Sequence, residues 1–584
     1  MDVPAVNAVT DHLPENIRHP NLRGLPKAIN PFAPAAHKPP VQANSSSGEI
    51  EWYSDWRWKN PFSWSVTLDE NREVLPPLKT RPPVYTYYEP NSTDPKSVRD
   101  AEERLLLQWR RAWWAQGFKP VVLGRPEAID NPLYRKVQRL QLNEQIEMEL
   151  ARWLAWGNMG TGILTNWLAF PMSSYDETFL SFLRRGSYPR LTRFEGLEGG
   201  IFCGEKAAIQ RAIDQAISDP EVKDARSLAD PRFSAILEAE STPSSIALYS
   251  TATLESKYKS VAKALFSSQT KAEGLRLLGS LINSHLHITW QSAFSSGGIV
   301  VVQPMAPHMS TVYEIAFDIA TNLTQCPWSP EPTTCPPNMG GSCKRCVSSQ
   351  PLRIETLPTF QNRSGTYHIA IVPHPYTTLT LTNEKDDGID VRFVRRLGME
   401  ARDPWLKEVT RDLVGTGPSE IKRITAFKEA VAGSHGSSNA LWLTVEKSDV
   451  RIDELELDWV FGFDLPAPIV DLHRSETPVP GPERRPKVNK VSSGVNLVPE
   501  ERDEELRRLR KSWDAVKSQL RQQVVAREAV EAWCMADTEA WRFARAFAER
   551  RKMERRVWEE EEKGFYGAEK KKKGTWGRWW DRRR

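Results

Sequence analysis

The chain has 584 residues, of which 40% are hydrophobic and 26% are charged. These values are ordinary for folded proteins, so the composition excludes a wholly disordered chain and allows about two or three domains. The net charge is only +4, which gives no case for nucleic acid as a partner. No run of about 18 apolar residues occurs, and the first residues lack the basic-then-apolar layout of a secretory signal.

The first part of the chain changes from irregular to regular. Residues 1–48 are rich in Pro, Asn, Ser and Ala without periodicity, which predicts a disordered arm. Residues 49–80 carry a tryptophan cluster and end in a proline-rich lead-in. Residues 84–88 then predict a strand, 98–116 a helix and 118–124 a second strand. This order is a βαβ unit, which implies a parallel sheet with a right-handed crossover.

The alternation of helices and strands continues. We expect a helix over 140–156, a glycine turn from Gly157 to Gly162, and an apolar strand that runs through Phe170. Further helices are expected over 205–217, 253–267 and 270–283, and further strands at 201–203, 285–290 and 298–303. Residues 81–320 are therefore predicted to form one α/β domain, with a mostly parallel sheet flanked by helices.

The remainder divides by composition. Residues 321–350 form a Cys- and Pro-rich loop, and 351–470 a second α/β region packed on the first, either extending its sheet or standing as a lobe. A proline-rich linker (471–498) leads to a long, charged helical segment (499–562) with coiled-coil character. That helix packs either on the core or on a partner. The basic, Trp-containing tail (563–584) is either solvated or touches anionic lipid headgroups at a membrane surface.

The run from residue 146 to 171, IEMELARWLAWGNMGTGILTNWLAFP, joins a helix bearing an acid and an arginine to a glycine turn and an apolar strand. It resembles the sugar-binding region of the glycosyltransferase family that includes the fungal initiating α-1,6-mannosyltransferases. In that family an acid precedes an arginine by three residues, paired glycines follow, and an Asp-x-Asp strand ends at a proline. The matching residues here are Glu149, Arg152, Gly160, Gly162, Asn166 and Pro171.

The resemblance implies a GT-A-like fold, a nucleotide sugar as donor, and a glycan or lipid as acceptor. It assigns the donor pocket to Glu149, Arg152, Gly160, Gly162, Asn166 and Trp167. The chain also looks like a group of uncharacterised fungal proteins of similar layout, which indicates lineage rather than activity.

The strand departs from that family, because it carries Thr165, Asn166 and Trp167 in place of the carboxylates. A GT-A enzyme uses those carboxylates to hold Mn²⁺ or Mg²⁺ against the nucleotide diphosphate. One replacement is that Asp176 and Glu177 act as the catalytic carboxylates, with Asn166 and Asp176 on the metal. Another is a metal-independent site in which arginines bind the diphosphate. Those arginines are Arg184, Arg185 and Arg193. In the plainer interpretation Asp176 is a helix cap.

Four cysteines gather in the Cys- and Pro-rich loop, separated by eight, seven and two residues. A zinc site usually needs two close pairs, and only the last two cysteines form one. We therefore expect two disulfides, with zinc or free thiols as the alternatives. The cysteines are Cys326, Cys335, Cys343 and Cys346.

Glycosylation sequons occur at Asn44, Asn91, Asn322 and Asn362, and we expect glycans at the last three. Together with the expected disulfides, they favour the secretory pathway or the Golgi lumen. A cytoplasmic location with reduced cysteines is the alternative.

Two functions remain open at this point. The first is a glycosyltransferase-like protein that transfers a hexose from a nucleotide sugar to a glycan or lipid. The second is a catalytically inactive scaffold or binding protein, whose helical C-terminus engages a partner or a membrane surface. Acids that converge near Asn166 favour catalysis, and an apolar or basic cleft favours binding.

Overall fold

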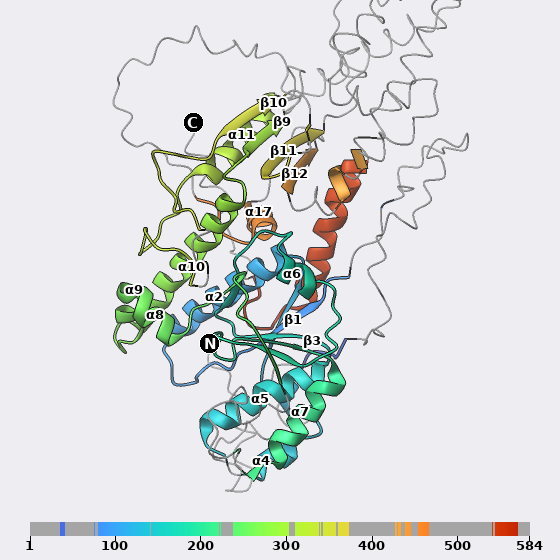
Figure 1. Ribbon diagram of the computed structural model, residues 1–584, viewed down its shortest axis with the longest axis vertical. Helices are drawn as coiled ribbons and strands as arrows, with labels where there is room; N and C mark the ends of the chain where they lie inside the picture. Colours follow the sequence, from blue (N-terminus) through green and yellow to red (C-terminus); the bar gives the residue numbers. More distant parts are fainter. Residues whose placement is uncertain are drawn as a thin grey trace, which may run out of the picture.

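The computed structural model describes residues 36–40, 75, 80–140, 142–220, 222, 237–302, 310–337, 339, 343–357, 360–361, 363–372, 427–428, 430–433, 439–444, 454–466, 540 and 543–569. Most of the predicted arm, the Trp-rich lead-in, the proline-rich linker and the basic tail beyond residue 569 lie outside these residues, as do Asn44 and Asn362. The described residues form an α/β protein with sheets and surrounding helices (Figure 1). Within this part of the chain, no helix has the length and apolarity needed to cross a bilayer.

The first sheet contains the predicted βαβ unit, which is confirmed. Strands β1 (Pro83–Tyr87) and β2 (Lys119–Leu123) pair in parallel, and α2 (Lys96–Ala115) connects them. Strand β3 (Gly162–Thr165) pairs in parallel with the other side of β1. The sheet has the order β2-β1-β3-β6-β5-β7, and β6 (Ile201–Gly204) is antiparallel to β3. Beyond β6 lie β5 (Thr192–Phe194) and, at the edge, β7 (Glu238–Glu240).

Helices cover both faces of this sheet. Val84 of β1 belongs to the hydrophobic core on the α2 side, and the next residue, Tyr85, belongs to the core beneath α5 (Glu144–Met159) and α7 (Lys206–Ser218). This alternation is the period of two expected for a strand. The short helices α3 (Arg125–Ile129) and α4 (Tyr134–Gln138) pack beside α5.

A second sheet has the order β10-β9-β11-β12, and all of its strands are parallel. Its strands are β9 (Gly298–Val302), β10 (Ile354–Leu357), β11 (Thr366–Val372) and β12 (Ala440–Thr444), and α11 (Ser310–Thr324) packs on β9 and β11. Strand β9 lies within the predicted first domain but pairs in this second sheet. One continuous core joins both sheets, so the two regions pack together.

The predicted strand at His285–Trp290 is wrong, because these residues belong to helix α10 (Lys271–Ala293). His285 and His287 are both fully buried, although a helix places such neighbours on different sides. The helix is buried on more than one side, so its apolar residues do not form a single stripe. Its sequence pattern is therefore equally compatible with a strand. The predicted helix 253–267 is divided at Tyr258 into α8 (Thr251–Lys257) and α9 (Lys259–Leu265).

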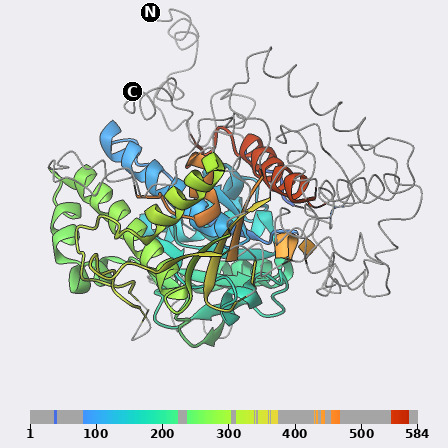
Figure 2. The same cartoon turned by 90° about the horizontal axis from the view of Figure 1, so that it is seen from above.

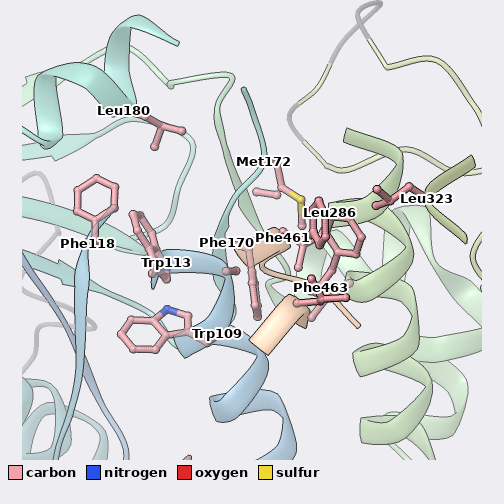
Figure 3. Close-up of a cluster of buried hydrophobic side chains, with 14 of the residues drawn as sticks. Trp109, Trp113, Phe118, Phe170, Met172, Leu180, Leu286, Leu323, Phe461 and Phe463 are labelled. Atoms are coloured by element: carbon pink, nitrogen blue, oxygen red, sulfur yellow. The ribbon is translucent and has the colours of Figure 1, made fainter. Parts of the chain in front are cut away.

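Helix α2 lies at the centre of the molecule, between the first sheet and α10 (Figure 1). Trp109 and Trp113 are fully buried, and the Nε1–H of Trp113 donates to the carbonyl of Ala169 at 3.1 Å. Ala169 begins β4 (Ala169–Pro171), which pairs in antiparallel fashion with β8 (Ile246–Leu248). Figure 3 shows this cluster of aromatic and aliphatic side chains around α2 and α10.

The described C-terminal helix (residues 543–561) packs on the core, the first of the two outcomes that the sequence left open. Phe543 contacts Phe427 beside the second sheet, with ring centroids 6.4 Å apart. At the other end Trp558 stacks on Trp114 of α2 at 4.7 Å, next to Trp459 of α17 (Glu454–Phe461). The helix, red in Figure 2, therefore bridges the second sheet and α2. Most of the predicted segment 499–562 lies outside the described residues.

The predicted disulfides are present, between Cys326 and Cys346 and between Cys335 and Cys343. The loop that they close is held on the core, because the hydroxyl of Tyr258 donates to the carbonyl of Cys335 at 2.7 Å. Two cross-links suit a Pro-rich loop that has little core of its own.

Replacement of Trp113 by alanine removes a fully buried indole and the hydrogen bond to Ala169. We expect the free energy of unfolding to fall by about 3–5 kcal/mol, because the cavity cannot close around a central helix. Urea denaturation measures the change. Trp328→Ala is the matched control, since Trp328 is 67% exposed and its loss should change stability by less than about 0.5 kcal/mol. Equal effects of the two substitutions would contradict the central position of α2.

Candidate functional site

Three parallel strands of the first sheet end in one row. In the register, Thr86 of β1 lies beside Val122 of β2 and Thr165 of β3. Ligands of open α/β sheets usually bind at the carboxyl ends of the strands. We call this row the carboxyl edge; it comprises Tyr88, Glu89, Gly124, Arg125, Asn166, Trp167 and the turn Gly199–Gly200 that precedes β6.

Helix α5 places Glu149 and Arg152 beside this edge. Arg152 forms an ion pair with Glu149 at 3.5 Å and donates to the carbonyl of Gly199 at 3.1 Å. Its guanidinium also lies 5.5 Å from the ring centroid of Phe202. Glu149 accepts a further hydrogen bond from the indole of Trp153 at 3.3 Å. The pair is mostly buried and joins α5 to the Gly199–Gly200 turn.

Asn166 contacts the same turn from the other side. Its backbone N–H donates to the carbonyl of Gly200 at 2.7 Å, and its side-chain oxygen accepts the N–H of Leu168 at 2.9 Å. Asn commonly forms such local turns. The structure therefore brings Glu149, Arg152 and Asn166 together around Gly199–Gly200. The guanidinium of Arg152 and the backbone N–H of Asn166 hold the turn.

The two predicted glycines lie at the other end of β3. Gly160 ends α5 with a φ of 95°, a conformation that favours glycine. A Cβ on Gly162 would lie 2.6 Å from the ring of Tyr85, so glycine is needed there for close packing of β1 on β3. Because β3 separates both glycines from Asn166, they shape the entry to the strand rather than the carboxyl edge.

The predicted catalytic carboxylates do not join Asn166. Glu177 caps α6 (Thr178–Leu183), with its carboxylate accepting the N–H of Leu180 at 3.0 Å. Burial alone would raise the pKa of Glu177, but hydrogen bonds from backbone N–H groups hold it below the usual value. Asp176 is exposed beside it, and β4, which spans about 10 Å, separates both acids from Asn166. The helix cap is therefore Glu177 rather than Asp176.

Two of the predicted arginines are placed in the same region. Arg184 donates to the carbonyl of Gln116 at 3.3 Å and stacks on the ring of Tyr175 at 3.8 Å, whereas Arg185 is exposed. Arg193 lies on β5, away from the carboxyl ends of β1 to β3. In the part of the chain that the structure describes, no three His, Cys, Asp or Glu side chains are arranged to hold a metal ion.

Sequence reasoning missed a charged cluster on the carboxyl edge. Arg125, two residues after the end of β2, pairs with Glu89 at 3.2 Å and with Glu147 of α5 at 3.5 Å. The hydroxyl of Tyr87 donates to Glu89 at 3.0 Å. Burial alone would lower the pKa of Arg125, but the charge of Glu89 and its other neighbours raises it. A signal was available, because charged residues that directly follow neighbouring parallel strands meet at one edge.

Aromatic rings also lie on the carboxyl edge. Trp167 is half-buried and meets Tyr88 edge to face, with ring centroids 5.9 Å apart. Tyr566, from the far end of the chain, contacts the other side of Tyr88 at 5.1 Å. The hydroxyl of Tyr88 donates to Glu102 of α2 at 2.7 Å. The carboxyl edge therefore combines a partly exposed indole with charged groups from three elements.

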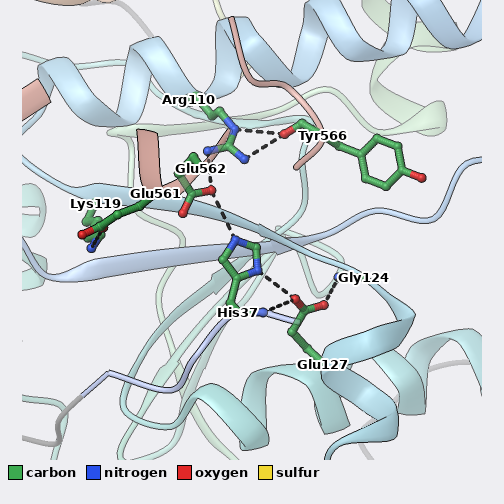
Figure 4. A network of polar contacts seen from close by, with 8 residues as sticks. All are labelled: His37, Arg110, Lys119, Gly124, Glu127, Glu561, Glu562 and Tyr566. Atoms are coloured by element: carbon green, nitrogen blue, oxygen red, sulfur yellow. Dashed lines mark hydrogen bonds and ion pairs between the residues drawn. The ribbon is translucent and has the colours of Figure 1, made fainter. Parts of the chain in front are cut away.

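The C-terminal segment is fixed here by a buried ionic network, shown in Figure 4. Arg110 of α2 pairs with Glu562 at 2.7 Å and donates to the carbonyl of Tyr566 at 2.8 Å. His37 lies between Glu127 at 2.8 Å and Glu562 at 3.3 Å. The network joins residues 36–40 and 562–566 beside β2, which is an edge strand of the sheet.

Comparison with known proteins places the chain in a family. A family model described as a domain of unknown function, DUF8765, matches residues 46–582, so the chain belongs to this family. Neither the curated proteins nor the solved structures contain a significant match.

The network around His37 predicts a pH dependence of stability. Burial alone would lower the pKa of His37, but hydrogen bonds and charge attraction from Glu127 and Glu562 raise it above 6.5. A raised pKa contributes stability fully below the unfolded value, and this stability is lost as pH rises through the folded value. We expect His37→Gln to lose more stability at pH 6 than at pH 8.5, by urea denaturation. Lys119→Gln, which breaks the exposed pair with Glu561, should cost the same at both pH values. A pH-independent effect of His37→Gln would contradict the charged network.

Proposed function

We propose that this protein is a non-catalytic binding protein on a glycosyltransferase-like α/β scaffold, and that its carboxyl edge binds the sugar part of a nucleotide sugar or glycan. The observations that carry the proposal are two hydrogen bonds: Arg152 donates to the carbonyl of Gly199, and the side-chain oxygen of Asn166 accepts the N–H of Leu168. Groups that hold the backbone are not free to bind a diphosphate or its metal ion. The predicted replacement acids, Asp176 and Glu177, stand beyond β4.

The binding role rests on the remaining groups of the edge. Trp167 offers a partly exposed indole, and such faces stack on the C–H surfaces of sugars. Glu89, Arg125 and Glu147 lie on the same carboxyl edge and supply charged groups that can hydrogen-bond sugar hydroxyls. Hydrophobic faces with a few polar groups are the usual composition of small-molecule sites.

The GT-A likeness supports this placement of the ligand. Three parallel strands are followed by the antiparallel β6, and the Asn166 position that resembles the Asp-x-Asp strand falls at the carboxyl edge. This supports a nucleotide sugar as the donor-type ligand and a glycan as its partner.

A second candidate is an active hexosyltransferase. It is favoured by three carboxylates beside the carboxyl edge, those of Glu89, Glu147 and Glu149, which can serve as acids or bases or approach Mn²⁺ or Mg²⁺ if their arginine pairs open. In that case the hexose passes to a glycan or lipid acceptor and a nucleoside diphosphate is released.

Ligand binding is tested by thermal unfolding with nucleoside diphosphates and their hexose derivatives, with and without Mn²⁺. Binding to the folded state raises the melting temperature. We expect sugar-containing ligands to stabilise the protein and Trp167→Ala to weaken the affinity about tenfold, equivalent to about 1.4 kcal/mol. Trp328→Ala should bind normally, because Trp328 is exposed in the disulfide-bonded loop.

The same samples separate the two candidates. Release of nucleoside diphosphate from a nucleotide sugar in the presence of glycan acceptors supports the transferase and refutes the non-catalytic assignment. Binding without release supports the non-catalytic assignment. The absence of any stabilisation refutes a sugar-nucleotide site at the carboxyl edge.

We also propose that the protein belongs to the secretory pathway. Two disulfides favour an oxidising compartment. Asn91 lies in an exposed turn, and the hydroxyl of Thr93 donates to its side-chain oxygen at 2.8 Å. Asn322 is less accessible, since it is half-buried on α11 and the hydroxyl of Thr324 in its sequon donates to the carbonyl of Thr321 at 2.8 Å.

This proposal predicts a glycan on Asn91. Protein from its native host, treated with peptide:N-glycosidase, should increase in gel mobility, and Asn91→Gln should remove most of the shift. Asn322→Gln is the matched control and should leave the larger part of the shift intact, because Asn91 is the more exposed acceptor. Unchanged mobility of the wild-type protein would contradict the secretory location.

A further inference from the structure

A group of arginines lies where the C-terminal helix passes the start of the first sheet. Arg550 and Arg551 are on this helix, and Arg81 directly precedes the residues that enter β1. The guanidinium carbons of Arg550 and Arg551 lie 5.8 Å and 5.9 Å from the ring centroid of Phe547. The region stands at the amino end of β1, away from the carboxyl edge, where the C-terminal helix runs between the two sheets (Figure 1).

One carboxylate is shared among these three cations. Arg81 pairs with Glu554 at 2.9 Å and also donates to the carbonyl of Trp114 at 2.8 Å. Arg550 and Arg551 form no ion pair with any residue that the structure describes. The Nε of Arg550 is buried without a hydrogen-bond partner. The group therefore holds three positive charges against one negative charge.

Burial makes this excess of positive charge energetically unfavourable. Burial lowers the pKa of Arg551, the nearby charge of Arg81 lowers it further, and Glu554 offsets part of the effect. Tyr175 and Tyr367 also lie within electrostatic range of Arg551. A buried cation without a counter-charge is strongly unfavourable unless an anion compensates it. Both Arg550 and Arg551 keep part of their surface accessible, so an anion can reach them from solvent.

We propose that Arg81, Arg550 and Arg551 form a binding site for a phosphate group. A dianion matches the two uncompensated charges. Guanidinium groups present paired N–H donors whose geometry fits phosphate oxygens, so this site favours phosphate over a simple monoanion. The phosphate is either free or part of a larger phosphorylated molecule, and the site is independent of the carboxyl edge.

The test uses the full chain at constant pH and ionic strength, with inorganic phosphate, pyrophosphate or acetate as the probe. Phosphate and pyrophosphate should raise the melting temperature by a few degrees at saturation, whereas acetate should not. Arg551→Gln should remove at least nine-tenths of the phosphate-dependent increase. Arg556→Gln is the matched control, because Arg556 is exposed on the same helix, and it should keep the full increase. Comparison of the two variants cancels the non-specific stabilisation that phosphate salts give to all proteins.

Stability without phosphate gives a second measurement. Because Arg551→Gln removes repulsion between cations, the variant should be at least as stable as the wild type in phosphate-free buffer. Arg551→Lys keeps the charge and loses the paired donors, so it should fold and bind phosphate at least fivefold more weakly by calorimetry. A wild-type protein that acetate and phosphate stabilise equally, or an Arg551→Gln variant with the full phosphate response, overturns the proposal.

Discussion

The architecture depends on helix α2 and on the two consecutive arginines near its C-terminal end. Arg110 binds Glu562 and the carbonyl of Tyr566, and Arg111 binds Asp458, Asp464 and Glu569. Burial raises the pKa of Asp458 to about 7, although the charge of Arg111 opposes this shift. Buried ion pairs add little net stability, but removal of one partner leaves an unpaired charge and is costly. These contacts therefore select one docking position for α17 and the C-terminal segment against α2.

Polar side chains also fix the backbone at the candidate site. The Gly199–Gly200 turn has to be held where β6 reverses direction beside β3, and Arg152 and Asn166 hold it. Residues that resemble those of a donor pocket therefore also stabilise the backbone of this turn. The contacts favour stabilisation of the turn over donor binding by Arg152 and Asn166. In the proposed binding role, Trp167 and the Glu89–Arg125 pair are then the groups that contact a ligand.

Local patterns predicted local structure well. The βαβ unit followed from a change of period between residues 84 and 124, and the two disulfides followed from cysteine spacing in a Pro-rich loop. The sequence failed where burial removes the pattern: α10 is apolar on several sides, so His285–Trp290 alternates like a strand. Long-range pairs carry no local signal at all, and His37 meets Glu562 across 525 positions. The spacing of Glu149 and Arg152 matched the acid–arginine pattern of a donor pocket. Nothing near them pointed to the carbonyl of Gly199 as a partner of Arg152.

The two arginine pairs of this chain differ in one physical respect. Arg110 and Arg111 are buried and each has carboxylate partners, which are drawn from segments more than three hundred residues away in sequence. Arg550 and Arg551 are adjacent in the same way and lie beside a third arginine. Among the described residues Glu554 is the one acid beside them, and it pairs with Arg81. A fold that recruits distant acids for the first pair has the means to neutralise the second. Among the described residues, Arg550 and Arg551 have no such partners. We therefore infer that a ligand supplies the missing negative charge.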